Sequence, residues 1–378
     1  PGSVVVSFEC MSRILEFDPA DRVMVVESVV VTAEIERLAR SAGLFYPPDP
    51  GSAPYCRIGG NLAMNAAGPR AVKYGVTRDY VLGLRAVAGD GRSLKTGCRT
   101  TKGVVGYDFT RLLVGSEGTL ALITEATLRL LPAPALTGTL RVCYDSTAHA
   151  CDAVLRIMTQ PVIPSALEFM DAQALAAIRR SGAADLPAGA QALLMVEADG
   201  EPQEVAHALE ALESHLRGPG LVELKRGLGA EEVAALWSAR RALSRAVKAI
   251  APLKINEDVV VPVSRLGQLV ARVETLARDH RLPIVSFGHA GNGNLHVNLM
   301  VHPDEPGELE RAHECLGELF RSVLDLQGTL SGEHGIGFEK RAFVPLEIPP
   351  ETLALMRAVK AEFDPHGILN PGKLFPPG

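Results

Sequence analysis

Residues 287–298 constrain the fold more than any other part of this sequence, because two histidines and three glycines stand there beside apolar runs. The apolar run 283–287 leads into the stretch, and apolar residues alternate with polar ones on the way out. This pattern is typical of two β-strands joined by a turn, for which Gly291 and Gly293 provide the backbone freedom. The sequence therefore predicts a β-hairpin at this point.

The polar side chains of this hairpin suggest a metal site. Successive residues of a strand face opposite ways, so His296 and Asn298 share a face, and His289 lies across the turn. Farther along the chain, Glu333 and His334 stand between glycines. Two imidazoles and a carboxylate with an open fourth position are a common ligand set for a divalent ion. A histidine pair in a turn is more often a surface feature, but the second glycine-rich motif favours the metal site.

Composition and charge restrict the class of protein. A chain of 378 residues is long enough for two domains. The net charge of -6 argues against a nucleic-acid partner, because phosphate binding needs a basic surface. No apolar run is long enough to span a membrane. The six cysteines form no CxxC pair, so we expect no iron–sulfur cluster and a cytoplasmic protein, with peripheral attachment to the inner membrane face as the alternative.

The first 132 residues predict a β-rich domain with three glycine-rich loops, at 47–52, 59–68 and 115–120. Small side chains let a planar ligand approach the backbone closely, although any one of these loops alone is equally consistent with a simple turn. The absence of GxGxxG and of the Walker A motif argues against a Rossmann NAD site and a P-loop. Strand-like runs lie at 4–8, 23–31, 80–88 and 120–131.

Beyond residue 132 the pattern changes to strands alternating with helices. Pro132 and Pro134 mark the change. Such a pattern predicts an α+β domain in which helices cover a sheet. We expect strands at 136–144, 165–170, 192–197 and 221–225, and helices at 148–159, 201–217, 231–250, 264–281, 308–326 and 350–363.

One charged residue lies on the apolar side of a predicted helix. The helix 231–250 has an apolar stripe at helical spacing, and Arg240 falls on this stripe, whereas Arg245 lies on the polar side. A guanidinium that faces a core needs an anion, because an unpaired buried charge is very costly. The partner is either an internal Asp or Glu or the carboxylate of a substrate, and the pattern leaves both open.

Six short motifs follow one another along nearly the whole chain. They are GN at 60–61 with NAAG at 65–68, KYG at 73–75, VGSEGTL at 114–120, GHAGNGNLH at 288–296, GEHGIG at 332–337, and DP at 364–365 with NPGK at 370–373. In this order they resemble the FAD-linked D-2-hydroxyacid dehydrogenases. That family includes glycolate oxidase D subunits, D-lactate dehydrogenases and D-2-hydroxyglutarate dehydrogenases.

The resemblance implies an α+β fold with three parts. Residues 1–132 would be an FAD-binding domain of the vanillyl-alcohol-oxidase (PCMH) type, 133–330 a substrate cap with an antiparallel sheet, and 331–378 a segment that returns to the FAD domain. The family's N-terminal strands and pyrophosphate loop have no counterpart here, so we expect a chain that lacks this N-terminal part. The positions implied to bind FAD are Pro48, Gly60, Asn61, Asn65, Ala66, Gly68, Gly115, Ser116, Glu117, Gly118, Thr119, Ile123 and Asn370.

The resemblance also implies roles for the polar residues of the hairpin and its surroundings. His289, His296 and Glu333 would bind a divalent ion, most commonly zinc. His334 would lie near the substrate hydroxyl, and Arg240 would bind the substrate carboxylate. Asn298, on the face of His296, completes the predicted catalytic set.

Ala67 and Ala121 stand where glycine is usual in the family. Alanine is tolerated at such positions when the backbone φ is negative. We therefore expect both residues to have ordinary backbone conformations.

We therefore predict oxidation of a small D-2-hydroxy acid, of the D-lactate, glycolate or D-2-hydroxyglutarate class, to the 2-keto acid. His334 would take the hydroxyl proton as general base, the metal would polarise the hydroxyl oxygen, and the hydride would pass to FAD. Electrons would then leave to a separate acceptor, either an electron-transfer protein or a quinone-linked partner. We also expect a homo-oligomer.

Two other functions fit part of the sequence. A metal-dependent hydrolase would use the same His/His/Glu set, but it leaves the three glycine-rich loops unexplained. Flavin absorbance at about 450 nm would distinguish the two, since only a flavin gives that band. A non-catalytic assembly subunit is the third hypothesis, and failure of an N-terminally extended protein to bind FAD would favour it.

Overall fold

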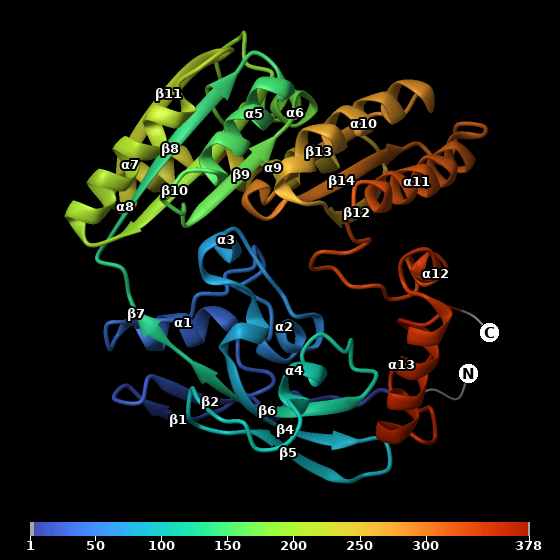
Figure 1. Cartoon of the computed structure of the whole chain (residues 1–378). Helices are drawn as coiled ribbons and strands as arrows, with labels where there is room; N and C mark the ends of the chain where they lie inside the picture. The colour runs from blue at the N-terminus through green and yellow to red at the C-terminus, as the bar shows by residue number, and fades with distance from the viewer. Residues whose placement is uncertain (1–3, 377–378) are drawn as a thin grey trace. The chain divides into compact units, whose positions relative to one another are not determined.

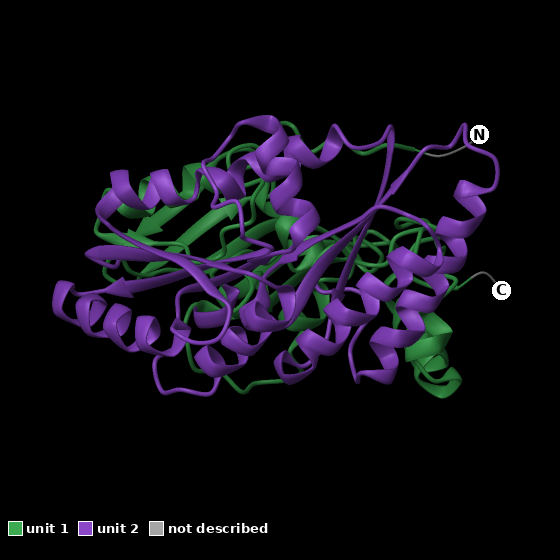
Figure 2. Cartoon of the chain, turned by 90° about the horizontal axis from the view of Figure 1, so that it is seen from above, with its two compact units in different colours: residues 1–70, 74–133, 333–378 green, residues 71–73, 134–332 purple. Residues whose placement is uncertain are grey.

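The computed structural model describes residues 4–376, and the chain divides into two compact units, which Figure 2 colours separately. Unit 1 contains residues 1–70, 74–133 and 333–378, and unit 2 contains residues 71–73 and 134–332. Figure 1 labels the helices and strands in chain order. Among the residues described, no helix is both long enough and apolar enough to cross a bilayer.

Unit 1 is built on a five-stranded antiparallel sheet with the strand order β1-β2-β6-β4-β5. Met24, Leu84 and Leu128, from three of these strands, are buried in one core together with Ile58 and Leu62 of helix α2. The core therefore holds α2, which contains part of the predicted FAD-binding set, against the sheet. The elements are β1 (Ile14–Asp18), β2 (Val23–Glu27), α1 (Thr32–Arg40), β3 (Leu44–Phe45), α2 (Ile58–Met64), α3 (Ala71–Tyr74), η1 (Thr77–Tyr80), β4 (Val81–Ala88), β5 (Ser93–Gly97), α4 (Phe109–Leu113), β6 (Ala121–Arg129), β7 (Leu131–Pro132), α12 (Val344–Glu347) and α13 (Pro350–Phe363), with α3 at the boundary of the units.

Unit 2 contains a seven-stranded antiparallel sheet with the order β11-β8-β10-β9-β13-β14-β12. Cys143, Met195 and Phe287 from this sheet form a buried cluster with Leu175 of α6 and Leu243 of α9. The predicted hairpin is present as β13 and β14, joined by η3. The elements are β8 (Leu136–Tyr144), α5 (Thr147–Met158), β9 (Ala166–Met170), α6 (Ala172–Ser181), β10 (Ala192–Gly200), α7 (Pro202–Leu216), β11 (Leu221–Leu228), α8 (Gly229–Leu236), α9 (Ser238–Lys248), β12 (Leu253–Val260), η2 (Val263–Arg265), α10 (Leu266–Asp279), β13 (Ile284–Gly288), η3 (Ala290–Asn292), β14 (Asn294–Val301) and α11 (Glu308–Asp325).

Two of the sequence-based expectations for unit 1 are wrong. Residues 4–8 form no strand: Val4 and Val5 are 86% and 92% exposed, and within residues 4–376 no strand pairs with this run. The expected loop 59–68 is largely helical, because α2 extends to Met64. A Cβ on Gly59 would lie only 2.8 Å from the Ser28 carbonyl oxygen, so this glycine allows a helix to approach a neighbouring chain segment.

The prediction of a single helix over 231–250 is also wrong. This segment forms two helices, α8 and α9, that meet at Trp237. The indole Nε1 of Trp237 donates to Thr139 Oγ1 at 3.3 Å, which directs this side chain toward strand β8. Other expectations hold. The strand 136–144 and the helix 350–363 have the expected bounds, neither Ala67 nor Ala121 has a positive φ, and all six cysteines are free thiols.

A buried ion pair fixes the C-terminal segment of unit 1. Asp364 is 3% exposed, and its carboxylate accepts hydrogen bonds from the backbone N–H groups of Ile368 and Leu369 at 3.1 and 2.8 Å and from Lys360 Nζ. Burial acts to raise the pKa of Asp364, but Lys360 and the backbone donors outweigh it and hold this pKa below its usual value. The carboxylate therefore stabilises the segment in its ionised form.

Replacing Asp364 by Asn should lower the free energy of unfolding by about 2–4 kcal/mol, because Asn leaves Lys360 without its counter-ion and one backbone N–H without an acceptor. The wild type should lose this stabilisation as the pH falls below about 4, since its carboxylate binds a proton more readily when unfolded. Urea unfolding at several pH values measures both effects. The matched control is Glu362→Gln. The Glu362 side chain is 79% exposed and lies on helix α13, which ends just before Asp364. Equal acid sensitivity in wild type and Asp364→Asn would contradict this role.

Candidate active site

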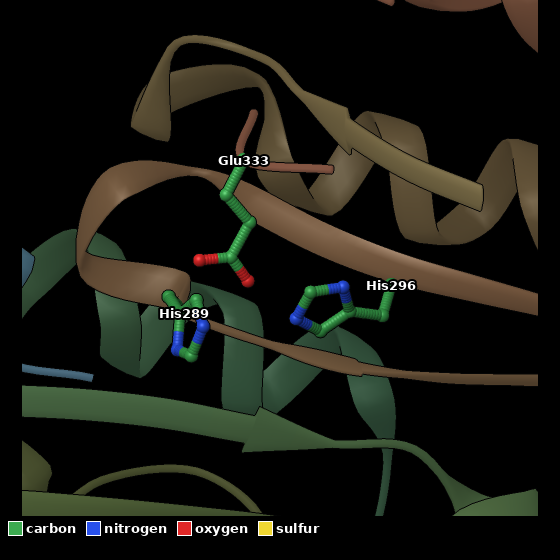
Figure 3. Close-up of side chains that lie close together, drawn as sticks. All are labelled: His289, His296 and Glu333. Carbon is green, nitrogen blue, oxygen red and sulfur yellow. The ribbon is translucent and has the colours of Figure 1, made fainter. Parts of the chain in front are cut away.

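Three side chains come close enough together to share one metal ion. One ligand atom from each of His289, His296 and Glu333 lies within 4.8 Å of the other two. The two histidines are 6% and 7% exposed, and Glu333 is half-buried. Figure 3 shows the Glu333 carboxylate directed toward the space between the two imidazole rings. His334 is exposed and does not belong to this group, so the structure brings together the three predicted ligand residues and leaves the predicted base beside them in sequence.

The strand register explains why the two histidines meet. His296 lies in β14, every residue of which is buried, and it stands opposite Asp258 of β12 on one side and Phe287 of β13 on the other. His289 follows β13 directly. Because β13 and β9 run antiparallel with Gly288 opposite Phe169, the next pair in the same register is His289 and Glu168. The sheet thus places a carboxylate next to each imidazole.

Glu168 joins His289 to Arg240. It is 0% exposed, its Oε2 accepts a hydrogen bond from Arg240 Nε at 2.8 Å, and its Oε1 contacts His289 Nδ1. Burial acts to raise the pKa of Glu168, but His289 and Arg240 outweigh it and lower the pKa to about 2. The carboxylate is therefore ionised near neutral pH, and the Nδ1–H group of His289 is the donor. The sequence left two possible partners for Arg240, an internal carboxylate or a substrate carboxylate. The structure contains the internal one, Glu168.

The contact with Glu168 occupies only one edge of the Arg240 guanidinium. The bond uses Nε, and the two terminal nitrogens make no hydrogen bond within the described residues. The side chain is 17% exposed, and its Cζ lies 5.0 Å from the centroid of the Phe287 ring. The outer edge of Arg240 is therefore available to a second anion, and carboxylates bind such an edge through two parallel hydrogen bonds.

Asp258 connects His296 to the segment that carries Glu333. Its side chain is fully buried, and Oδ1 lies 3.7 Å from His296 Nδ1 and accepts a hydrogen bond from Asn294 Nδ2 at 2.6 Å. Its Oδ2 accepts the backbone N–H of Gly332 at 2.8 Å. Because Gly332 immediately precedes Glu333, this carboxylate holds the segment that carries the candidate ligand Glu333 in place.

Asn298 contributes a buried acceptor near His296. It is 0% exposed, and its Nδ2 donates to the carbonyl oxygens of Val285 and His296 at 3.0 and 3.2 Å. Its Oδ1 has no hydrogen-bond partner among the described residues. A buried acceptor without a partner is costly, so this oxygen suits a ligand that donates a hydrogen bond.

The glycine-rich segments of unit 1 lie side by side. The backbone N–H groups of Gly115 and Glu117 donate to the carbonyl oxygens of Leu62 and Ala63 at 2.8 and 2.9 Å, which joins residues 114–120 to helix α2. Next to this junction is a cavity of about 260 Å³. Its lining includes Gly60, Gly118 and Ile123 of the predicted FAD-binding set, together with Phe8, Ser28, Val29, Arg57, Gly59, Ala63, Ala121 and Leu122.

Other members of the predicted FAD-binding set form hydrogen bonds with other residues of the chain. The Glu117 carboxylate accepts the backbone N–H groups of Ile336 and Gly337 at 2.7 and 2.8 Å, and Asn370 Nδ2 donates to the Glu117 carbonyl. Asn61 Nδ2 donates to Thr32 Oγ1, and Asn65 Oδ1 accepts the N–H of Arg78. These side chains therefore position the chain around the cavity. The remaining members do not line it: Pro48, Gly68, Ser116 and Thr119 are buried, and Ala66 is half-buried.

The sequence did not lead us to predict two residues of the site, Glu168 and Asp258. Each is an acidic residue in a strand that is otherwise mostly apolar or buried, in 166–170 and 253–260. A carboxylate in such a run needs a buried partner, so this was the available signal. The partners themselves lie far away in sequence, since His289 follows Glu168 by 121 residues.

Comparison with known proteins gives two family matches. A model described as "FAD linked oxidases, C-terminal domain" matches residues 133–374, and one described as "FAD binding domain" matches residues 1–97. The glycolate oxidase subunit GlcD of Bacillus subtilis (strain 168) is 39% identical over 99% of this chain and 80% of its own length. The D-2-hydroxyglutarate dehydrogenase of Stutzerimonas stutzeri (strain A1501) is 34% identical over 99% of this chain and 82% of its own length. The D-lactate dehydrogenase of Anaerostipes hadrus is 34% identical, with coverages of 99% and 80%.

The fold also matches that of a solved structure. The substrate-bound structure of p-cresol methylhydroxylase superposes with a TM-score of 0.71, covering 96% of this chain and 78% of the other. At 15% identity this similarity concerns the fold alone. The architecture is therefore the PCMH type of α+β fold.

Proposed function

The chain belongs to the FAD-linked oxidase family, and on that premise we propose that it oxidises a small D-2-hydroxy acid to the 2-keto acid with the help of a divalent metal ion. One observation carries this proposal. Arg240, which has a free edge for a carboxylate, is joined through Glu168 to His289, one of three clustered metal-ligand candidates. A 2-hydroxy acid has its carboxylate next to its hydroxyl carbon, so it suits a cation and a metal placed close together.

The donor set fits a divalent ion, and zinc in particular. Two imidazoles and one carboxylate are the ligands that zinc takes in catalytic sites, where a fourth position stays open. His289, His296 and Glu333 would hold the ion. When bound, it acts as a Lewis acid that makes an alcohol proton easier to remove.

Residues of this chain perform the remaining steps. The outer edge of Arg240 binds the substrate carboxylate and orients the molecule. Asn298 Oδ1, a buried acceptor without a partner among the described residues, accepts the hydrogen bond of the substrate hydroxyl until that proton is removed. His334 removes this hydroxyl proton as the general base. FAD, which the cavity lined by Gly60, Gly118 and Ile123 would hold, would supply the two-electron oxidant, and a separate acceptor would reoxidise it.

The cavity beside α2 fits the proposed flavin site. A Cβ on Gly60 would meet nothing within 4 Å, so a larger side chain there would extend into space that the protein leaves open. Gly60→Leu should therefore weaken FAD binding by about tenfold or more, through steric exclusion from the cavity. It should not lower the melting temperature of the FAD-free protein, because Leu is a better helix former than Gly.

Fluorescence titration of the purified protein with FAD measures this effect. Gly189→Leu is the matched control, because a Cβ at that glycine also meets nothing within 4 Å and Gly189 does not line the cavity. An FAD dissociation constant that is the same in both variants and the wild type would contradict this site.

The proposed function itself is tested with a substrate panel. The FAD- and zinc-loaded protein is assayed with D-lactate, glycolate, D-2-hydroxyglutarate and D-malate, with an artificial dye as electron acceptor and L-lactate as the stereochemical control. Dye reduction by at least one of the four acids, with a 2-keto acid as product, is the expected result. Bound FAD without oxidation of any of them would overturn the proposal.

A further inference from the structure

We propose that Glu168 is a positioning residue that controls two functions at once: it holds His289 ready to bind the metal, and it orients Arg240 toward the substrate carboxylate. This inference rests on the proposed function and adds to it a residue that touches neither metal nor substrate. The two oxygens of one buried carboxylate are divided between the two groups. Changes at Glu168 should therefore affect metal binding and substrate binding together.

The position of Glu168 leaves it no other role among the described contacts. It stands in the middle of β9, whose five residues are all buried, and its side chain is 0% exposed. Among residues 4–376, its hydrogen bonds go only to His289 and Arg240. Burying a charged carboxylate costs free energy unless both of its oxygens have partners. The contacts with His289 and Arg240 therefore make the charge of Glu168 tolerable inside the strand.

The contact with His289 determines which ring nitrogen can bind a metal. Oε1 of Glu168 contacts Nδ1 of His289, so Nε2 is the ring nitrogen that is left to bind a metal. A carboxylate behind a histidine ligand in this way fixes the ring orientation and raises the basicity of the ligating nitrogen. Loss of such a partner typically weakens metal binding about 10–100-fold.

The contact with Arg240 determines which edge of the guanidinium faces outward. Since Glu168 holds Nε at 2.8 Å and the Phe287 ring lies against Cζ at 5.0 Å, the plane of the group is restrained on two sides. The edge formed by the two terminal nitrogens then points away from Glu168. A bidentate contact depends on this orientation, because both N–H groups must meet both oxygens of the ligand.

Glutamine is the informative replacement at position 168. It has nearly the same shape as glutamate but has an oxygen at only one of its two terminal positions, so it cannot accept from His289 at one position and from Arg240 at the other. Glu223→Gln is the matched control. Glu223 also lies in the unit 2 sheet and pairs with two cations, Arg141 at 2.8 Å and Lys225 at 2.9 Å, but it lies on the edge strand β11.

The first measurement is zinc affinity, by competition with a chromophoric chelator, which needs no catalytic activity. We expect Glu168→Gln to bind zinc about 10–100-fold more weakly than the wild type, and Glu223→Gln to bind it within about twofold. Melting curves of the metal-free proteins separate this effect from unfolding. If Glu168→Gln is folded and binds zinc as tightly as Glu223→Gln, the positioning role is wrong although the proposed metal site stands. If the wild type and Glu223→Gln bind no zinc, the metal site itself is wrong, and the inference fails with it.

The second measurement is KM for the hydroxy acid at saturating zinc, in the Arg240 and the Arg240→Lys backgrounds. Lysine has no Nε–H to bond to Glu168, so the orienting contact is already absent there. We expect Glu168→Gln to raise KM about tenfold in the Arg240 background and less than about twofold in the Arg240→Lys background, because the two changes remove the same contact. Equal increases in both backgrounds would overturn the orienting role of Glu168.

Discussion

Alanine in place of His296 should remove bound zinc and lower kcat/KM by about 10³-fold or more. The metal is expected to contribute several kcal/mol of transition-state stabilisation, and each 1.4 kcal/mol corresponds to a tenfold change in rate. The remaining ligands, His289 and Glu333, cannot hold the ion in a defined geometry by themselves. The measurement is metal content by mass spectrometry together with steady-state rates on the acid that the substrate panel identifies.

The control for His296→Ala is His313→Ala, because His313 is an exposed histidine of helix α11. It should keep both the metal and the rate. Flavin content must stay the same in all three proteins, since the FAD candidates lie in unit 1 and His296 lies in unit 2. A folded His296→Ala protein that retains zinc and activity would show that the cluster of His289, His296 and Glu333 is not the metal site.

Alanine in place of Arg240 should raise KM for the hydroxy acid by about 10²-fold, with a smaller effect on kcat. Truncating one partner of a buried hydrogen-bonded charge pair typically costs about 2–5 kcal/mol, and binding of the carboxylate is required equally in the ground state and the transition state. The variant also leaves Glu168 with His289 as its remaining partner, so some loss of thermal stability is expected. Arg245→Ala is the matched control, since Arg245 is exposed on the same helix α9.

Competition by an inert monocarboxylate, such as acetate, sharpens the test of Arg240. It should inhibit the wild type and the Arg245→Ala variant, and it should inhibit Arg240→Ala much more weakly. A variant that lacks Arg240 but keeps the wild-type KM would assign the carboxylate to another residue.

The hairpin and the long helices were predictable because their patterns are local. Residues 283–299 combine an apolar run, turn-forming glycines and strict alternation, and α11 and α13 have helical periodicity over 18 and 14 residues. Helix α2 was missed because its two glycines are poor helix formers, and only the close approach to Ser28 shows why Gly59 is needed. At the break between α8 and α9, Trp237 donates a hydrogen bond to Thr139, 98 residues earlier in the chain, and a local pattern does not reveal such a contact.

In the candidate site too, local sequence patterns were predictable, whereas contacts between distant segments were not. The proposed ligand residues His289, His296 and Glu333 were recognisable from residue type and spacing. The carboxylates Glu168 and Asp258, which position them, were not, because they reach the histidines through strand pairings between distant segments. Arg240 was recognisable as a residue that needs an anion, but only the register of β9 against β13 identifies Glu168 as that anion.

The most direct test of the account is the rate at which a substrate acid reduces the bound flavin, followed anaerobically by the loss of absorbance at about 450 nm. The FAD-loaded protein is mixed with the acid after metal depletion, and again after zinc is returned. We expect flavin reduction to be about 10²-fold or more slower without the metal and to recover its rate when zinc is returned. Flavin reduction at the same rate in the metal-depleted protein would contradict it.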